Sequence, residues 1–137
     1  MYTKILVPMA LDHDISPQTL ALARALMAPG GSIVALHVHE EPEGSVRAYL
    51  DEGVVEAGRA RALAMLTEKT ASASDVESVL VSGHSARTII DYAHAHAVDC
   101  IVLGSHRPGL SNYFLGSTAA RVVRHAACAV HVHRTAE

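Results

Sequence analysis

Aromatic side chains are scarce in this sequence, and their scarcity limits how a core can be built. Of the 137 residues none is Trp, one is Phe and four are Tyr, whereas 50% are hydrophobic. The core must therefore come from Val, Leu, Ile and Ala, which suits a buried parallel sheet covered by Ala-rich helices. The length fits one domain, and we expect residues 1–137 to form it.

An excess of positive charge is also absent, since the formal net charge is −3. Nothing in that balance favours nucleic acid or anionic lipid as a partner. No apolar run is long enough to span a bilayer, and the short run ending at Pro8 is unlike a secretory signal. The two thiols, Cys100 and Cys128, lack metal-ligand or CxxC spacing and are typical of reduced, buried cysteines, so we expect a cytoplasmic protein.

Apolar runs alternate with segments of helical spacing. Strands are predicted at residues 5–7, 33–38, 76–81, 100–103 and 129–133. Between them we expect a helix from Ser16-Pro17 to Pro29-Gly30-Gly31, one from Val46 to Thr70 capped by Ser45, one capped by Ser85, and one from near Ser117. This order predicts an α/β protein with an open, mostly parallel sheet and helices on both faces. Such sheets bind ligands at the carboxyl ends of strands where the winding reverses.

The loop from Gly104 to Thr118 joins a predicted strand to a predicted helix. Gly104 would let a ligand approach the backbone closely, and Gly116 precedes hydroxyl residues at a helix N-terminus, where the dipole favours phosphate. Candidate donors from this loop are His106, Arg107, Ser117 and Thr118. The alternative is that the two glycines only shape turns and Ser117 only caps the helix. The loop lacks the Gly-Lys-Ser/Thr ending of a Walker sequence.

This loop, the following segment 119–128 and the opening Lys4-Ile5-Leu6-Val7-Pro8 resemble the universal stress protein family, in particular its short single-domain branch. The resemblance spans the whole chain. It implies a Rossmann-like sheet of five strands in the order 3-2-1-4-5. The family's nucleotide loop is written as Gly, two residues, Gly, nine residues, Gly and Ser or Thr. Here Gly104 to Gly116 is one residue short and His106 or Arg107 occupies the second glycine position, so Gly109 is not a secure equivalent.

The resemblance also implies an adenine nucleotide as ligand, ATP or AMP, with or without Mg²⁺. The adenine would lie against the ends of the first two strands and the phosphates against the glycine loop. The family's ribose-binding aspartate is replaced by Ala10, and Asp12 is a candidate substitute. The implied binding residues are Pro8, Met9, Ala10, Asp12, Val38, Leu103, Gly104, His106, Arg107, Gly109, Gly116, Ser117 and Thr118.

Catalysis and metal binding have little support in the sequence. The loop 104–118 contains no carboxylate to hold Mg²⁺, and Lys4 and Lys69 are the chain's lysines, so hydrolysis should be slow or absent and no catalytic residue is assigned. A hydrolase assisted by His106 and Arg107 is the less favoured interpretation. Two-residue spacing along strands pairs His37 with His39 and His131 with His133, but hydrogen-bonded histidines are favoured over metal ligands, and no metal site is predicted.

The resemblance implies a regulatory or signalling role in the stress response, with homodimers formed through Ala129 to His133. That segment is apolar enough to pair with a twofold mate instead of remaining a bare edge. An unknown protein partner is compatible with this role. The alternative function is a protein-interaction module of the same fold whose nucleotide site is weakened by the short loop and Ala10.

Overall fold

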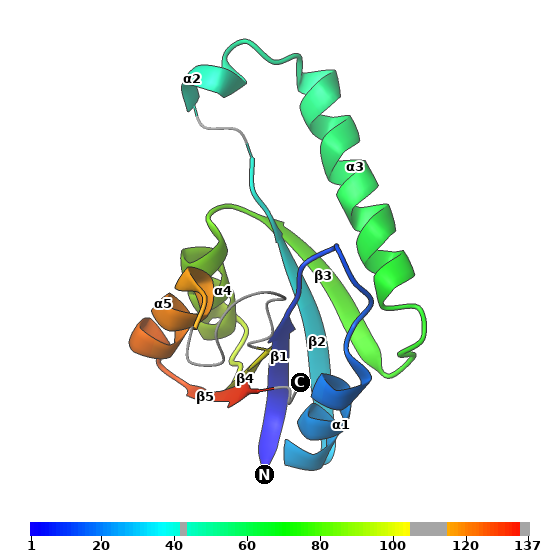
Figure 1. Ribbon diagram of the computed structural model, residues 1–137, viewed down its shortest axis with the longest axis vertical. Coiled ribbons are helices and arrows are strands. Elements are labelled where there is room, and N and C mark those ends of the chain that lie inside the picture. Colours follow the sequence, from blue (N-terminus) through cyan, green and yellow to red (C-terminus); the bar gives the residue numbers. More distant parts are fainter. Residues whose placement is uncertain (42–43, 105–114, 135–137) are drawn as a thin grey trace.

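The computed structural model describes residues 1–41, 44–104 and 115–134. Its centre is a parallel sheet of five strands in the order β3-β2-β1-β4-β5, which confirms the predicted order (Figure 1). The strands are β1 (Tyr2–Pro8), β2 (Met27–His39), β3 (Val76–Ser82), β4 (Cys100–Gly104) and β5 (Ala129–His133). All four neighbouring pairs are parallel, so the five carboxyl ends lie along one edge.

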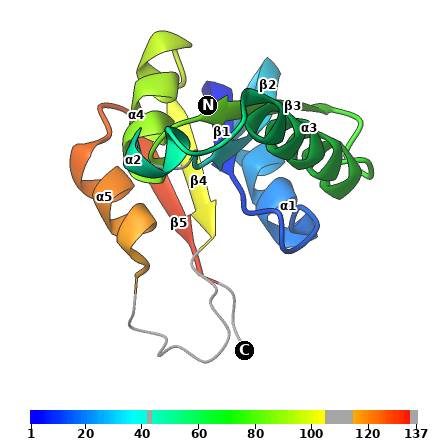
Figure 2. The same ribbon diagram turned by 90° about the horizontal axis from the view of Figure 1, so that it is seen from above.

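Helices cover both faces of the sheet, as predicted (Figure 2). They are α1 (Pro17–Leu26), α2 (Gly44–Arg47), α3 (Glu52–Lys69), α4 (Ser85–Ala95) and α5 (Ser117–His125). Leu20 of α1 packs with Val102 of β4 on one face, and Val122 of α5 packs with Leu103 of β4 on the other. Among the described residues, no helix combines the length and the apolar character needed to cross a membrane.

Side chains of β4 alternate between the two layers because successive residues of a strand point to opposite faces. Cys100 and Val102 pack towards α1, whereas Ile101 and Leu103 pack towards α4 and α5. All four are buried. This two-sided burial explains why β4 appears in the sequence as a continuous apolar run.

The start of α1 matches the prediction, but its end does not. Ser16 Oγ accepts a hydrogen bond from the Thr19 N–H at 3.3 Å, and Pro17 occupies the first turn. The helix ends at Leu26, and the segment Pro29-Gly30-Gly31, which we expected to terminate it, belongs to β2.

An irregularity in the pairing of β1 with β2 accounts for this difference. Tyr2 pairs with Met27 and Lys4 with Ser32, so two steps along β1 match five along β2. Gly30 adopts a φ of +78° within this bulge. Glycine and proline are common in bulges as well as in turns, and here Pro29-Gly30-Gly31 forms part of a bulge.

The helix predicted from Val46 to Thr70 is two helices, α2 and α3. The Asp51 carboxylate accepts a hydrogen bond from the Gly53 N–H at 3.1 Å and caps α3, because a short side-chain acceptor satisfies a free N–H of the first turn. Ser45 lies inside α2 and not at its cap. Similarly, Ser85 is the first residue of α4, and His84 stands at the cap position. Both α2 and the first part of α3 project beyond the carboxyl edge of the sheet (Figure 1).

The amino end of β4 is tied to β1 by Asp99. Its carboxylate accepts hydrogen bonds from the Thr3 N–H at 2.8 Å, the Lys4 N–H at 2.9 Å and the Thr3 hydroxyl at 3.0 Å. Desolvation alone would raise the pKa of Asp99, but these hydrogen bonds outweigh it and lower the pKa below its ordinary value. Next along the chain, burial raises the pKa of the Cys100 thiol to about 11.

Candidate functional site

The centre of the carboxyl edge is the point where the winding of the sheet reverses. The chain leaves β1 towards α1 on one face, and after β4 it reaches α5 on the other. The two strands are direct neighbours. Diverging connections leave a crevice beyond the ends of such strands, which is where open α/β sheets bind ligands.

Gly104 closes β4 at this point and is exposed. The nearest atom to a Cβ built on it is Thr19 Oγ1, at 4.0 Å, which is an ordinary contact distance. Its φ lies outside the left-handed region, in which only Gly30 and Gly83 occur among the described glycines. Within the described part of the chain, neither packing nor backbone conformation therefore requires glycine at position 104.

Gly116 stands at the N-cap of α5 with a φ of −57°, and a Cβ built on it meets no atom of the described residues within 4 Å. Its carbonyl accepts the Ala120 N–H at 2.9 Å, which starts the helix. No side chain among the described residues caps this end. Ser117 is exposed and is the first residue of α5, so the alternative in which Ser117 caps the helix is wrong. Free N–H groups and the helix dipole at such a terminus favour an anion.

Pro8 and Met9 continue β1 to the same edge. Pro8 pairs with Leu36, and the Met9 N–H donates to the Leu36 carbonyl at 2.9 Å. His37 Nδ1 donates to the Met9 carbonyl at 2.9 Å, which fixes both the imidazole and the first turn of the loop. The favoured interpretation of His37 as a hydrogen-bonded group agrees with this contact. The described residues contain no group of three or more His, Cys, Asp or Glu side chains able to hold a metal ion.

The side chains expected to surround the adenine are divided between the two faces of the sheet. Val38 and Leu103 are 8% and 5% exposed and pack in the core on the α4 and α5 side. Met9 packs on the α1 and α3 side, and Ala10 beside it is exposed. The structure therefore brings the strand ends together without turning these side chains towards one common point.

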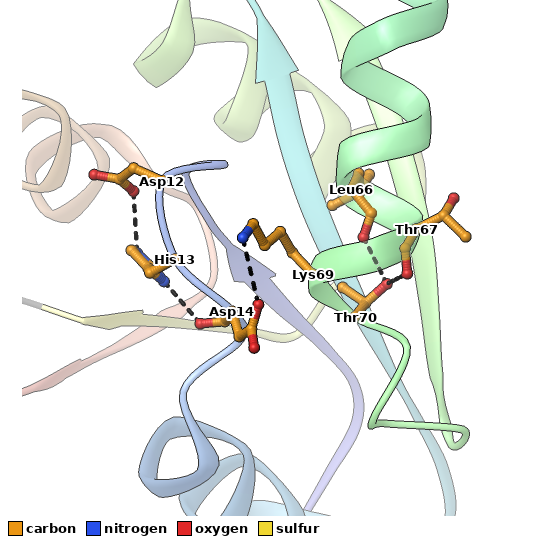
Figure 3. A network of polar contacts seen from close by, with 7 residues as sticks. All are labelled: Asp12, His13, Asp14, Leu66, Thr67, Lys69 and Thr70. Atoms are coloured by element: carbon orange, nitrogen blue, oxygen red, sulfur yellow. Dashed lines mark hydrogen bonds and ion pairs between the residues drawn. The ribbon is translucent and has the colours of Figure 1, made fainter.

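Asp12 lies on an exposed loop between β1 and α1 (Figure 3). Its carboxylate is 3.6 Å from His13 Nε2, and His13 Nδ1 donates to the Asp14 carbonyl at 2.8 Å. Asp14 in turn is 3.6 Å from Lys69 Nζ at the end of α3. The loop is thus tied to α3 while the Asp12 side chain stays 81% exposed.

Three of the predicted binding residues, His106, Arg107 and Gly109, lie outside the described residues. Two other side chains near Gly104 were not assigned to a nucleotide site from the sequence. Thr19, on α1, is 6% exposed, and His133, at the end of β5, pairs in register with Gly104. The sequence carried no signal for Thr19, and it pointed to His133 only for its spacing from His131 and as the end of the expected dimer segment.

The profile of the Universal stress protein family matches residues 1–134. The chain belongs to the universal stress protein family. The match covers the strand ends, the glycine loop and β5 alike. It therefore includes every part of the candidate site.

Known universal stress proteins align with nearly all of this one. Universal stress protein G of Shigella flexneri is 27% identical over 143 residues, which cover 98% of this chain and 100% of the relative. The solved structure of UspA from Lactobacillus plantarum is also 27% identical, with a TM-score of 0.70 over 96% of this chain and 97% of that one.

Two further solved structures of the same fold contain ligands. A universal stress protein in complex with cAMP is 23% identical, with a TM-score of 0.65, and covers 98% of this chain and 99% of its own. The universal stress protein from Archaeoglobus fulgidus in complex with dAMP is 21% identical, with a TM-score of 0.52 over 96% of this chain and 97% of its own.

Proposed function

We propose that this universal stress protein binds an adenine nucleotide, ATP or AMP with or without Mg²⁺, at the carboxyl ends of β1 and β4. The observation that carries the proposal is the pair of glycines. Gly104 and Gly116 stand at a strand end and a helix start, yet the packing and backbone of the described residues do not require glycine at either position. A glycine that the fold does not need leaves room for a ligand close to the backbone.

The phosphates bind between Gly104 and the N-terminus of α5, with Ser117, Thr118, His106, Arg107 and Gly109 as further contacts. Anions are favoured there because the free N–H groups of α5 point towards them. The adenine lies at the strand ends near Pro8 and Met9. Val38 and Leu103 contribute through backbone, since their side chains are buried in the core.

The choice of an adenine nucleotide rests on the ligands of the two solved relatives, cAMP and dAMP. Both carry adenine and a 5′-phosphate, but neither offers the two free ribose hydroxyls of AMP. Ala10 likewise offers no side-chain partner for a ribose, although Asp12 is exposed on the same loop. Recognition in this chain therefore depends mainly on base and phosphate.

The protein acts in this proposal as a cytoplasmic regulatory or signalling homodimer of the stress response, with slow or no hydrolysis. In the described sheet β5 is an edge strand, and an edge with free backbone groups is suited to pair with a second copy. A monomer at micromolar concentration in size-exclusion chromatography with light scattering would argue against the dimer. Hydrolysis that survives both His106→Ala and Arg107→Ala would point to a contaminating enzyme.

Calorimetric titration of nucleotide-free protein with ATP and AMP, with and without Mg²⁺, tests the site. Gly116→Val combined with Ser117→Ala should abolish binding, because the valine occupies the space left free at the start of α5. Gly44→Val is the matched control, since Gly44 also begins a helix and a Cβ there meets none of the described atoms within 4 Å. It should bind as the wild type does. Absence of binding by folded wild-type protein would instead favour the protein-interaction module.

A further inference from the structure

Two polar side chains flank Gly104 on one face of the sheet. Gly104 pairs in register with His133, just as Cys100 pairs with Ala129 at the other end of the two strands. Since residues four apart in a strand point the same way, Gly104 and His133 share the face on which Cys100 packs. Helix α1 covers that face, and its Thr19 Oγ1 lies 4.0 Å from the Cβ position of Gly104.

The polar atoms of both side chains lack partners within the described part of the chain. His133 Nε2 is buried and makes no hydrogen bond to any described residue. The described hydrogen bond of Thr19 uses its backbone N–H, and the hydroxyl has no partner among residues 1–41, 44–104 and 115–134. Thr19 is nevertheless only 6% exposed. Buried polar atoms are nearly always hydrogen-bonded in folded proteins, so His133 Nε2 requires a partner that the described chain does not provide, and the Thr19 hydroxyl is a second donor without a described partner.

We propose that Thr19 and His133 bind a phosphate group of the nucleotide, on the α1 side of Gly104. This inference rests on the proposed function. A hydroxyl and an imidazole N–H both donate, and phosphate oxygens accept several hydrogen bonds at once. Thr19 also stands in the first turn of α1, where the helix dipole favours negative charge. The phosphate therefore lies beside the N-terminus of α1, next to Gly104, which leaves space there.

Titration of the full-length protein with AMP and with adenosine separates phosphate contacts from contacts to the base and sugar. Thr19→Val keeps the branched shape and removes the hydroxyl, and His133→Leu removes the imidazole. Each should weaken AMP binding by about tenfold or more, the loss expected for one hydrogen bond to a charged group. Adenosine affinity should not change.

His131→Leu is the matched control, because His131 lies two residues earlier on the same face of β5 but is exposed and pairs with Val102 instead of Gly104. It should leave both affinities unchanged. Thr19→Ser and His133→Gln retain a donor and should keep AMP affinity within about threefold of wild type. If thermal unfolding shows that Thr19→Val or His133→Leu is misfolded, the comparison of Thr19→Ser and His133→Gln with wild type takes its place.

Unchanged AMP binding in both Thr19→Val and His133→Leu would overturn the inference while leaving the proposed function intact. An equal loss of AMP and adenosine affinity would also overturn it, since the side chains would then act on the base, the sugar or the fold. Wild-type protein that binds neither compound would refute the nucleotide site itself, and this inference with it.

Discussion

The two ends of β4 differ in how fully the chain satisfies the hydrogen-bonding groups around them. At the amino end, the Asp99 carboxylate accepts three hydrogen bonds from Thr3 and Lys4. At the carboxyl end, Gly104 is exposed, and the neighbouring His133 has a buried nitrogen without a partner among the described residues. We call the Asp99 end of β4 the closed end, because its polar groups are paired within the chain, and the Gly104 end the open end.

This contrast separates residues that stabilise the fold from residues that serve a ligand. The polar groups of Asp99 find their partners within the chain, and removing them should cost stability. The groups around Gly104 gain little from the chain, so changing them should alter binding much more than folding. Each end therefore predicts a different experimental signature.

The closed end should protect the first residue of β4 from chemical modification. Burial raises the pKa of Cys100 from 9.0 to about 11. Since the thiolate is the reactive form, roughly hundredfold less of it is present at about pH 8 than for an ordinary thiol. Alkylation followed by mass spectrometry in a Cys128→Ser variant measures this directly. Rapid labelling of Cys100 in the folded protein, at the rate seen in urea, would show that this end is open.

Replacing Asp99 with Ala should lower the free energy of unfolding by about 2 kcal/mol, because two backbone N–H groups and a hydroxyl lose a charged acceptor. Urea unfolding provides the measurement. Asp91→Ala is the control, since Asp91 forms an exposed pair with Arg87 at 3.8 Å and its loss should change stability by less than about 0.5 kcal/mol. Equal effects of the two variants would contradict the special role of Asp99.

The stabilisation by Asp99 should disappear in acid. Its pKa is lower in the folded protein than the unfolded value of about 3.9, so the folded state favours the ionised form. The contribution is therefore present above about pH 4 and is lost as the pH falls through the folded pKa. Unfolding curves of wild type and Asp99→Asn should converge over that range. A difference that stays constant with pH would exclude the carboxylate as its cause.

The smallest effect on stability is expected at the open end. Gly104→Ala should change the free energy of unfolding by less than about 0.5 kcal/mol, since the added methyl group meets only an ordinary contact. Gly83, at the turn after β3, provides the contrast. Its φ is +147° and a Cβ would collide with the Thr88 side chain, so Gly83→Ala should cost about 2 kcal/mol. Similar losses in both variants would mean that Gly104 is a structural glycine.

The buried strands could be predicted well from the sequence because a strand that is buried on both faces is apolar at every position. Runs such as Ile5-Leu6-Val7 and Cys100 to Leu103 are apolar at every position, and the family resemblance supplied their order in the sheet. The bulge at Pro29-Gly30-Gly31 was missed because the same residues also end helices. The break before α3 was missed because Asp51 caps a helix inside a segment whose apolar spacing looked continuous.

The candidate site was predictable only where its residues follow one another in the chain. The stretch from Gly104 to Thr118 carries a local pattern of glycines and hydroxyls that indicates phosphate. Thr19 and His133 come from a helix and a strand 114 positions apart by their numbers, and their relation appears only when α1 is packed over the sheet. Likewise, the sequence placed Val38 and Leu103 near strand ends. It did not show that side-chain alternation along these buried strands points both residues into the core.

The central place of β1 also affects how the chain folds. One side of β1 pairs with β2, which follows after a single helix. The other side pairs with β4, which is far along the chain, since Ile5 pairs with Cys100. During synthesis the middle of the sheet therefore stays incomplete until most of the chain has been made. Closing such a long loop is entropically costly and slow. Until β4 has been synthesised, one edge of the central strand β1 stays unpaired and can pair with other nascent chains.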